Sequence, residues 1–77
     1  MKQVIIYSKN NCMQCKMVKR YLTENHIPFE EINIDEQPEA VASLKAQGFR
    51  SVPVITSAEK ELTIVGFRPD QLKQLAS

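Results

Sequence analysis

The chain has little of what marks a membrane, secreted or nucleic-acid-binding protein. It has no long apolar run, and its first residues lack the apolar stretch of a signal peptide, so we expect neither a membrane span nor secretion. Ten Lys and Arg residues nearly balance nine Asp and Glu residues, which gives no reason to propose a nucleic-acid or membrane-surface partner. The cytoplasm is therefore the expected compartment.

Cysteine and histidine are also scarce. With two cysteines and one histidine, the chain lacks the four ligands of a structural zinc site. Small secreted domains use several well-separated disulfides, whereas Cys12 and Cys15 are only three positions apart. Closing so short a loop stabilises a fold by only about 2 kcal/mol. We therefore expect the pair to serve chemistry, with bound zinc, coincidental core cysteines and an iron–sulfur cluster shared between two chains as the alternatives.

The 77 residues, 43% of them hydrophobic, predict one α/β domain spanning residues 1–77. Asn10 or Asn11 is expected to cap the first helix, Pro28 to end it, and Gly48 to stop the second. The order βαβαββα predicts a four-stranded mixed sheet with three helices on its faces, the first two strands being parallel. The expected strands are Lys2–Tyr7, Phe29–Ile34, Val52–Ile55 and Glu61–Val65, with a turn over Thr56–Lys60 and helices over Met13–Asn25, from Pro38 and from Pro69.

The two cysteines follow a strand and open a helix, which is typical of a thioredoxin-like redox motif. Cys12 would lie at the positive end of the helix dipole, near Lys9 and Lys16, and these charges favour thiolate over thiol. Cys15 shares the apolar face of the helix with Val18, so we predict that it is shielded and acts as the resolving thiol.

The residues between the cysteines, Met13 and Gln14, are expected to be exposed and to contact a partner. His26, at the end of the same helix, is interpreted as a surface residue.

Two further segments are candidates for the same site. Val52-Pro53 opens a short buried strand, where a cis peptide bond would aim the backbone of Val52 at the sulfurs. By pattern alone, a trans proline is the more common case. Gly66-Phe67-Arg68 precedes a helix that begins at Pro69. From pattern alone, a core position is slightly the better interpretation of Phe67, and a solvated position is an alternative for Arg68.

Together these segments resemble the glutaredoxin branch of the thioredoxin fold, and most closely the NrdH-redoxins, over essentially the whole chain. Cys12-Met13-Gln14-Cys15 is similar to that family's active site, Ser51-Val52-Pro53-Val54 to its cis-proline segment, and Gly66-Phe67-Arg68-Pro69 to its Gly-Phe-Arg-Pro segment. Ile64-Val65 stands where many members have Trp-Ser, so the hydrogen bonds of that pair would be absent here.

The resemblance implies a cofactor-free, monomeric dithiol carrier that thioredoxin reductase reduces and that reduces the large subunit of class Ib ribonucleotide reductase. It implies catalysis by Cys12 and Cys15, a cis Pro53, and partner contacts by Met13, Gln14, Val52, Pro53 and Gly66–Arg68. Because Phe67 adds bulk and no aromatic residue lies between the cysteines, glutathione is expected to bind poorly. A glutathione-dependent glutaredoxin and a non-catalytic iron–sulfur or metal carrier remain the alternatives.

Overall fold

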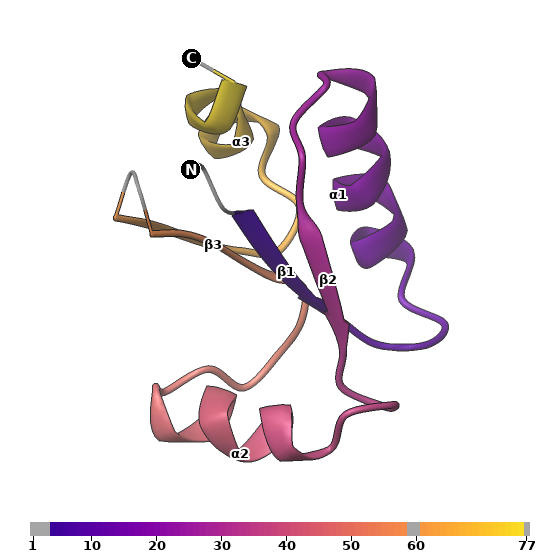
Figure 1. Cartoon of the computed structure of the whole chain (residues 1–77), viewed down its shortest axis with the longest axis vertical. Helices are drawn as coiled ribbons and strands as arrows, with labels where there is room; N and C mark the ends of the chain where they lie inside the picture. The colour runs from indigo at the N-terminus through magenta and orange to yellow at the C-terminus, as the bar shows by residue number, and fades with distance from the viewer. Residues whose placement is uncertain (1–3, 59–60, 77) are drawn as a thin grey trace.

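The computed structural model describes residues 4–58 and 61–76. Their helices and strands follow the predicted βαβαββα order (Figure 1). The strands are β1 (Val4–Ser8), β2 (Glu30–Asn33), β3 (Val54–Ser57) and β4 (Leu62–Val65), and the helices are α1 (Met13–Glu24), α2 (Glu39–Ala46) and α3 (Pro69–Ala76).

The four strands form one mixed sheet in the order β2-β1-β3-β4. β1 pairs with β2 in parallel, with Tyr7 opposite Ile32, and with β3 in antiparallel, with Tyr7 opposite Val54. β4 pairs with β3 alone and forms an edge of the sheet. This arrangement confirms the thioredoxin/glutaredoxin fold predicted from the sequence, including the parallel first pair.

One core joins α1 and α3 to the sheet. Every second residue of β1 is buried and the residues between them are half-buried, because successive side chains of a strand point to opposite faces of the sheet. Leu72 and Leu75 are buried on the inner side of α3. The buried cluster comprises Val4, Ile6, Val18, Leu22, Ile27, Ile55, Ile64, Leu72 and Leu75. The buried residues of α2, Ala40 and Leu44, do not belong to this cluster, and Figure 1 shows α2 well apart from α1 and α3.

The predicted bounds of the third strand are wrong. β3 begins at Val54 and continues through Thr56 and Ser57, which the sequence analysis had placed in a turn. Pro53 therefore precedes the ladder, where its missing N–H costs no strand hydrogen bond. Lys2, at the expected start of the first strand, and Lys60, at the expected end of the turn, lie outside the described residues.

The prediction that Pro28 ends α1 is also imprecise. The last turn closes with Ile27 N–H donating to Leu22 O (2.9 Å) and His26 N–H to Thr23 O (3.1 Å), while His26 has a positive φ of 57°. This is the Schellman pattern, in which one left-handed residue lets the chain satisfy the last free carbonyls. The exposed His26 therefore has a local structural role.

The predicted stop of α2 at Gly48 is confirmed. Gly48 has a φ of 92°. Its backbone N–H donates to the Lys45 carbonyl, and the Phe49 N–H donates to the Leu44 carbonyl. Pro38, expected as the first helical residue, is the N-cap instead.

None of the helices in the described ranges combines the length and the apolar character needed to cross a lipid bilayer.

Candidate functional site

The two cysteines form a disulfide at the start of α1, with their Cα atoms 5.2 Å apart. Cys12 is the N-cap residue, and its Sγ accepts a hydrogen bond from the Cys15 backbone N–H at 3.1 Å. The expectation that Asn10 or Asn11 caps this helix is therefore wrong, because the sulfur of Cys12 occupies that position. Cys15 is 1% exposed and Cys12 is 8% exposed, so the predicted shielding of Cys15 is confirmed.

The position of Cys12 suits a thiolate. The free N–H groups and the positive end of the α1 dipole face its sulfur, and the first turn of α1 contains no acidic residue. A negative sulfur at this position therefore gains a hydrogen bond and a favourable dipole without a competing carboxylate in that turn. Met13 is 70% exposed and Gln14 is exposed as well, so both are accessible beside the disulfide, as predicted.

Gln14 links the cysteine turn to the loop between β4 and α3. Its side-chain Oε1 accepts a hydrogen bond from the Phe67 backbone N–H at 3.4 Å. Gly66 N–H donates to Pro53 O at 2.9 Å, and Arg68 Nε donates to Val65 O at 3.0 Å. The cysteine turn, the Pro53 segment and the Gly66–Arg68 loop therefore meet. These hydrogen bonds hold the loop in place although Ile64-Val65 replaces the Trp-Ser pair of many NrdH-redoxins.

Gly66 is required by the backbone of this loop. Its φ of 86° lies in the left-handed region, while a Cβ built on it would make only an ordinary contact with Gln14 Oε1 at 3.4 Å. A larger residue would therefore strain the backbone.

The remaining predicted residues have distinct surroundings. The Val52–Pro53 peptide bond is cis, as the resemblance implies, and Pro53 is buried while Val52 is half-buried. Phe67 is half-buried and packs against the core. Arg68 is exposed.

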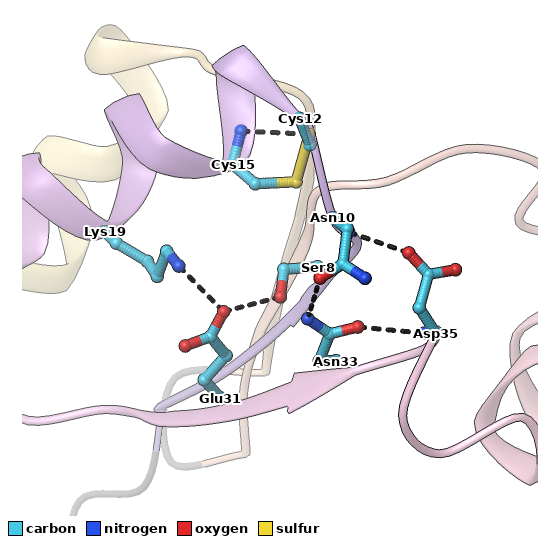
Figure 2. A network of polar contacts seen from close by, with 8 residues as sticks. All are labelled: Ser8, Asn10, Cys12, Cys15, Lys19, Glu31, Asn33 and Asp35. Atoms are coloured by element: carbon cyan, nitrogen blue, oxygen red, sulfur yellow. Dashed lines mark hydrogen bonds and ion pairs between the residues drawn. A yellow bond between two sulfur atoms is a disulfide. The ribbon is translucent and has the colours of Figure 1, made fainter.

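A polar network that the sequence analysis missed lies one turn beyond Cys15. Ser8, 1% exposed at the end of β1, donates from Oγ to Glu31 Oε2 at 2.6 Å. Lys19 Nζ lies 2.9 Å from the same oxygen, and Figure 2 shows both groups directed at the Glu31 carboxylate. Lys19 is four residues after Cys15 and therefore on the same side of α1. The four-residue spacing of Cys15 and Lys19 could have identified Lys19 from the sequence. The sequence does not show that β2 brings Glu31 next to Lys19.

Lys19 and Ser8 together hold the pKa of the Glu31 carboxyl below its usual range. The largest cause is the hydrogen bond from Lys19, followed by that from Ser8, while partial burial acts in the opposite direction. Because the folded-state pKa is lowered, the resulting stability is present above the unfolded-state pKa and is lost as the pH falls through the folded-state value.

We expect Lys19→Met to lower the free energy of unfolding at pH 7 by about 0.5–1 kcal/mol, a range discounted for solvent because both side chains are 34% exposed. At a pH below the folded-state pKa the wild type and the variant should converge. Urea unfolding at both pH values measures this. The control, Arg20→Met, removes a pair with Glu24 that is 80% and 61% exposed, and should cost only a few tenths of a kcal/mol. An equal loss for both variants would contradict the role of Glu31.

A second set of hydrogen bonds fixes the loop that leads to Cys12 (Figure 2). Asn10 N–H donates to Asp35 Oδ2 at 2.8 Å, and Asn33 Nδ2 donates to Asn10 Oδ1 at 3.1 Å. Asp35 N–H in turn donates to Asn33 Oδ1 at 2.9 Å. Asn10 therefore connects the loop before Cys12 to the end of β2 through hydrogen bonds. This is the role of Asn10, which was expected to cap α1.

Across the described ranges, no three or more His, Cys, Asp or Glu side chains gather closely enough to form a metal site. Among residues 4–58 and 61–76, the two cysteine sulfurs therefore have no further side chain of these kinds close by.

Comparison with known proteins agrees with this geometry. The sequence profile of the glutaredoxin family matches residues 4–61. The glutaredoxin-like protein NrdH of Lactococcus lactis subsp. lactis is 58% identical over 73 residues, which cover 95% of this chain and 99% of that protein. The Escherichia coli NrdH protein is 42% identical over 73 residues, covering 95% of this chain and 88% of that protein.

The fold comparison extends this agreement. The structure of Escherichia coli NrdH-redoxin superposes with a TM-score of 0.88 at 42% identity, covering 95% of this chain and 93% of that one, and that protein is described as having a thioredoxin-like activity profile. Three findings agree on the family of this chain. They are the disulfide between Cys12 and Cys15 at the start of α1, the predicted fold and these similarities. The chain belongs to the glutaredoxin family, among its NrdH glutaredoxin-like redox proteins.

Proposed function

We propose that this protein is a monomeric, cytoplasmic dithiol carrier that takes two electrons from thioredoxin reductase and delivers them to the C-terminal disulfide of a class Ib ribonucleotide reductase large subunit. The main support is the Cys12–Cys15 disulfide at the start of α1, where the residues between the cysteines are exposed. Gln14 connects this turn to the β4–α3 loop through its hydrogen bond with Phe67. The NrdH name of its relatives and the thioredoxin-like activity profile described for the Escherichia coli protein favour these partners.

The reaction begins at Cys12. In the reduced protein its thiolate attacks one sulfur of the partner disulfide, so that a mixed disulfide forms, the partner S–S bond breaks and one partner sulfur leaves as a thiolate. Cys15 then loses its proton and attacks the Cys12 sulfur, which releases the second partner sulfur. The cysteine pair, oxidised to the Cys12–Cys15 disulfide, has given up two electrons to the partner, whose disulfide ends as a dithiol after taking up two protons.

The neighbouring segments receive the partner in this proposal. Met13 and Gln14 contact it from the helix start, Val52 and Pro53 from the segment before β3, and Gly66–Arg68 from the β4–α3 loop. The hydrogen bonds of Gly66 to Pro53 and of Phe67 to Gln14 keep these three segments together, so the partner meets a surface that is already ordered.

The same contacts argue against glutathione as the reductant. A carboxylate arriving at the β4–α3 loop would find the Phe67 N–H already bonded to Gln14 Oε1. It would have to displace that bond, because the N–H has one hydrogen to donate. Phe67 is only half-buried, and its side chain packs partly against the core.

The test compares two reducing systems. With insulin as the disulfide substrate, we expect NADPH plus thioredoxin reductase to support turnover at least roughly tenfold faster than NADPH plus glutathione and glutathione reductase, a difference of about 1.4 kcal/mol. NADPH oxidation measures both rates, and reactions without the redoxin give the background. Faster turnover with glutathione would refute the proposal in favour of a glutaredoxin. A coloured, cluster-bearing protein that reduces no insulin would favour the carrier alternative.

A further inference from the structure

The outer face of α1 exposes two methionines beside the disulfide. Met13, the first residue of the helix, is 70% exposed, and Met17 is 40% exposed. They are four residues apart and therefore neighbours on the helix surface. The same face continues with Arg20 and Glu24, which pair with each other. The apolar part of this face is therefore confined to the turns next to the disulfide.

Packing does not account for the side chain of Met13. With this exposure it adds little buried surface to the fold, and α1 contributes to the core from its other side, through Val18 and Leu22. Met13 directly follows Cys12 in the chain, so its thioether lies at the surface that the proposed function assigns to the partner. The distinctive chemical property of this side chain is an accessible sulfur.

The redox state of the cysteines decides which sulfur of this turn meets an oxidant. In the disulfide form neither cysteine has a thiolate, and Cys12 and Cys15 are only 8% and 1% exposed. The thioether of Met13 needs no deprotonation and is open to solvent. In the reduced form the Cys12 thiolate is the better nucleophile and reacts with a peroxide first. Oxidation of Met13 is therefore favoured in the disulfide form, while the carrier awaits its reductant.

We propose that Met13 is a site of oxidation by hydroperoxides, and that its sulfoxide slows the reaction of this protein with protein disulfides. The thioether sulfur attacks the terminal oxygen of the hydroperoxide, and the O–O bond breaks as the S–O bond forms. The proton of that oxygen passes to the other one, which leaves as an alcohol, or as water when the oxidant is hydrogen peroxide. The sulfur loses two electrons and the peroxide gains them. The inference rests on the proposed function, because it requires that a partner protein covers Met13.

The sulfoxide converts an apolar contact surface into a polar one. Its oxygen is hydrated in the free protein, and a partner that covers Met13 has to remove that water. A small disulfide reaches Cys12 without covering Met13, so the effect is specific to protein disulfides. It is also reversible, because methionine sulfoxide reductases convert the sulfoxide back to the thioether.

The experiment treats the disulfide form with hydrogen peroxide, removes the peroxide with catalase and then reduces the cysteine pair with dithiothreitol, which is removed in turn. Peptide mass spectrometry should show sulfoxide at Met13 before Met17, in the order of their exposure. In single turnovers, we expect the treated wild type to reduce insulin at least roughly threefold more slowly than the untreated protein, with the rate for 2-hydroxyethyl disulfide unchanged within about twofold. Methionine sulfoxide reductases for both sulfoxide epimers should restore the insulin rate.

Two leucine variants form a matched pair. Met13→Leu keeps an apolar side chain without sulfur and retains Met1 and Met17, so its insulin rate after peroxide should stay within about 1.5-fold of its own untreated rate. Met17→Leu retains Met13 and should lose as much of its rate as the wild type does. The comparison of treated with untreated protein is made within each variant, so any effect of the substitution itself cancels.

Each outcome decides the proposal. Sulfoxide at Met17 with Met13 intact, an unchanged insulin rate once Met13 is oxidised, or an equal loss in Met13→Leu would overturn it. An equal loss of rate with 2-hydroxyethyl disulfide would place the damage at the cysteines and would overturn it as well. If the untreated protein reduces neither substrate, the dithiol function fails and the inference fails with it. A normal untreated rate that peroxide leaves unchanged refutes the inference alone.

Discussion

Replacing Cys12 by serine should abolish disulfide reduction, whereas replacing Cys15 by serine should stop the reaction at a mixed disulfide. A serine hydroxyl is not ionised at neutral pH, so Cys12→Ser removes the attacking anion, and we expect the rate to fall by at least about a thousandfold. Cys15→Ser keeps Cys12 at the helix start but removes the thiol that releases the partner. Insulin reduction measures the loss, and intact-protein mass spectrometry detects the trapped conjugate.

Alkylation of the reduced wild type tests the same order of attack. Cys12 lies at the end of the helix dipole and is the more exposed of the two, at 8% against 1% for Cys15, so it should react first with iodoacetamide at neutral pH. Both serine variants should retain the circular dichroism of the wild type, since neither enlarges a side chain. Initial labelling at Cys15, or a stable conjugate formed by Cys12→Ser, would reverse the assigned roles.

The elements of the fold were predictable because their signals are local. The apolar run of β1, the glycine after α2 and the cysteine spacing each act within a few residues, and their structural consequences agree with prediction. Boundaries were less predictable where two local preferences compete. Asparagine is normally the better helix cap, yet Asn10 bonds to Asn33 and Asp35, and the chain places the sulfur of Cys12 at the cap.

The candidate site was predictable in its parts but not in its connections. Motifs identified the cysteine turn, the Pro53 segment and the Gly66 loop, but only the folded chain shows Gln14 bonded to Phe67 across 53 positions. The same holds for Ser8 and Glu31, which are 23 positions apart. Such contacts depend on strand register and helix placement, and neither is encoded in the spacing of the residues concerned.

The second large effect concerns stability, since the disulfide site depends on the packing of α1. Leu22 is fully buried in the core, and Ile27, whose N–H closes the end of the helix on the Leu22 carbonyl, belongs to the same cluster. Leu22→Ala removes a buried apolar side chain and leaves a cavity, so we expect it to cost about 2–5 kcal/mol. A chain of this length has a total stability of about 4–12 kcal/mol, so the loss is a large share of it.

Met17→Ala is the matched control, because Met17 lies on the same helix, is of similar size and is 40% exposed. It should cost less than about 1 kcal/mol, since a side chain that already contacts water over 40% of its surface loses less burial and leaves no closed cavity. Urea unfolding of the oxidised proteins, with the Cys12–Cys15 bond intact in each, measures both values. An equal loss in the two variants would show that the inner face of α1 does not carry the stability assigned to it. Below the unfolding transition, the rate of insulin reduction per folded molecule should stay within about twofold for Leu22→Ala, because Leu22 supports the helix that presents Cys12 without touching the reacting sulfurs.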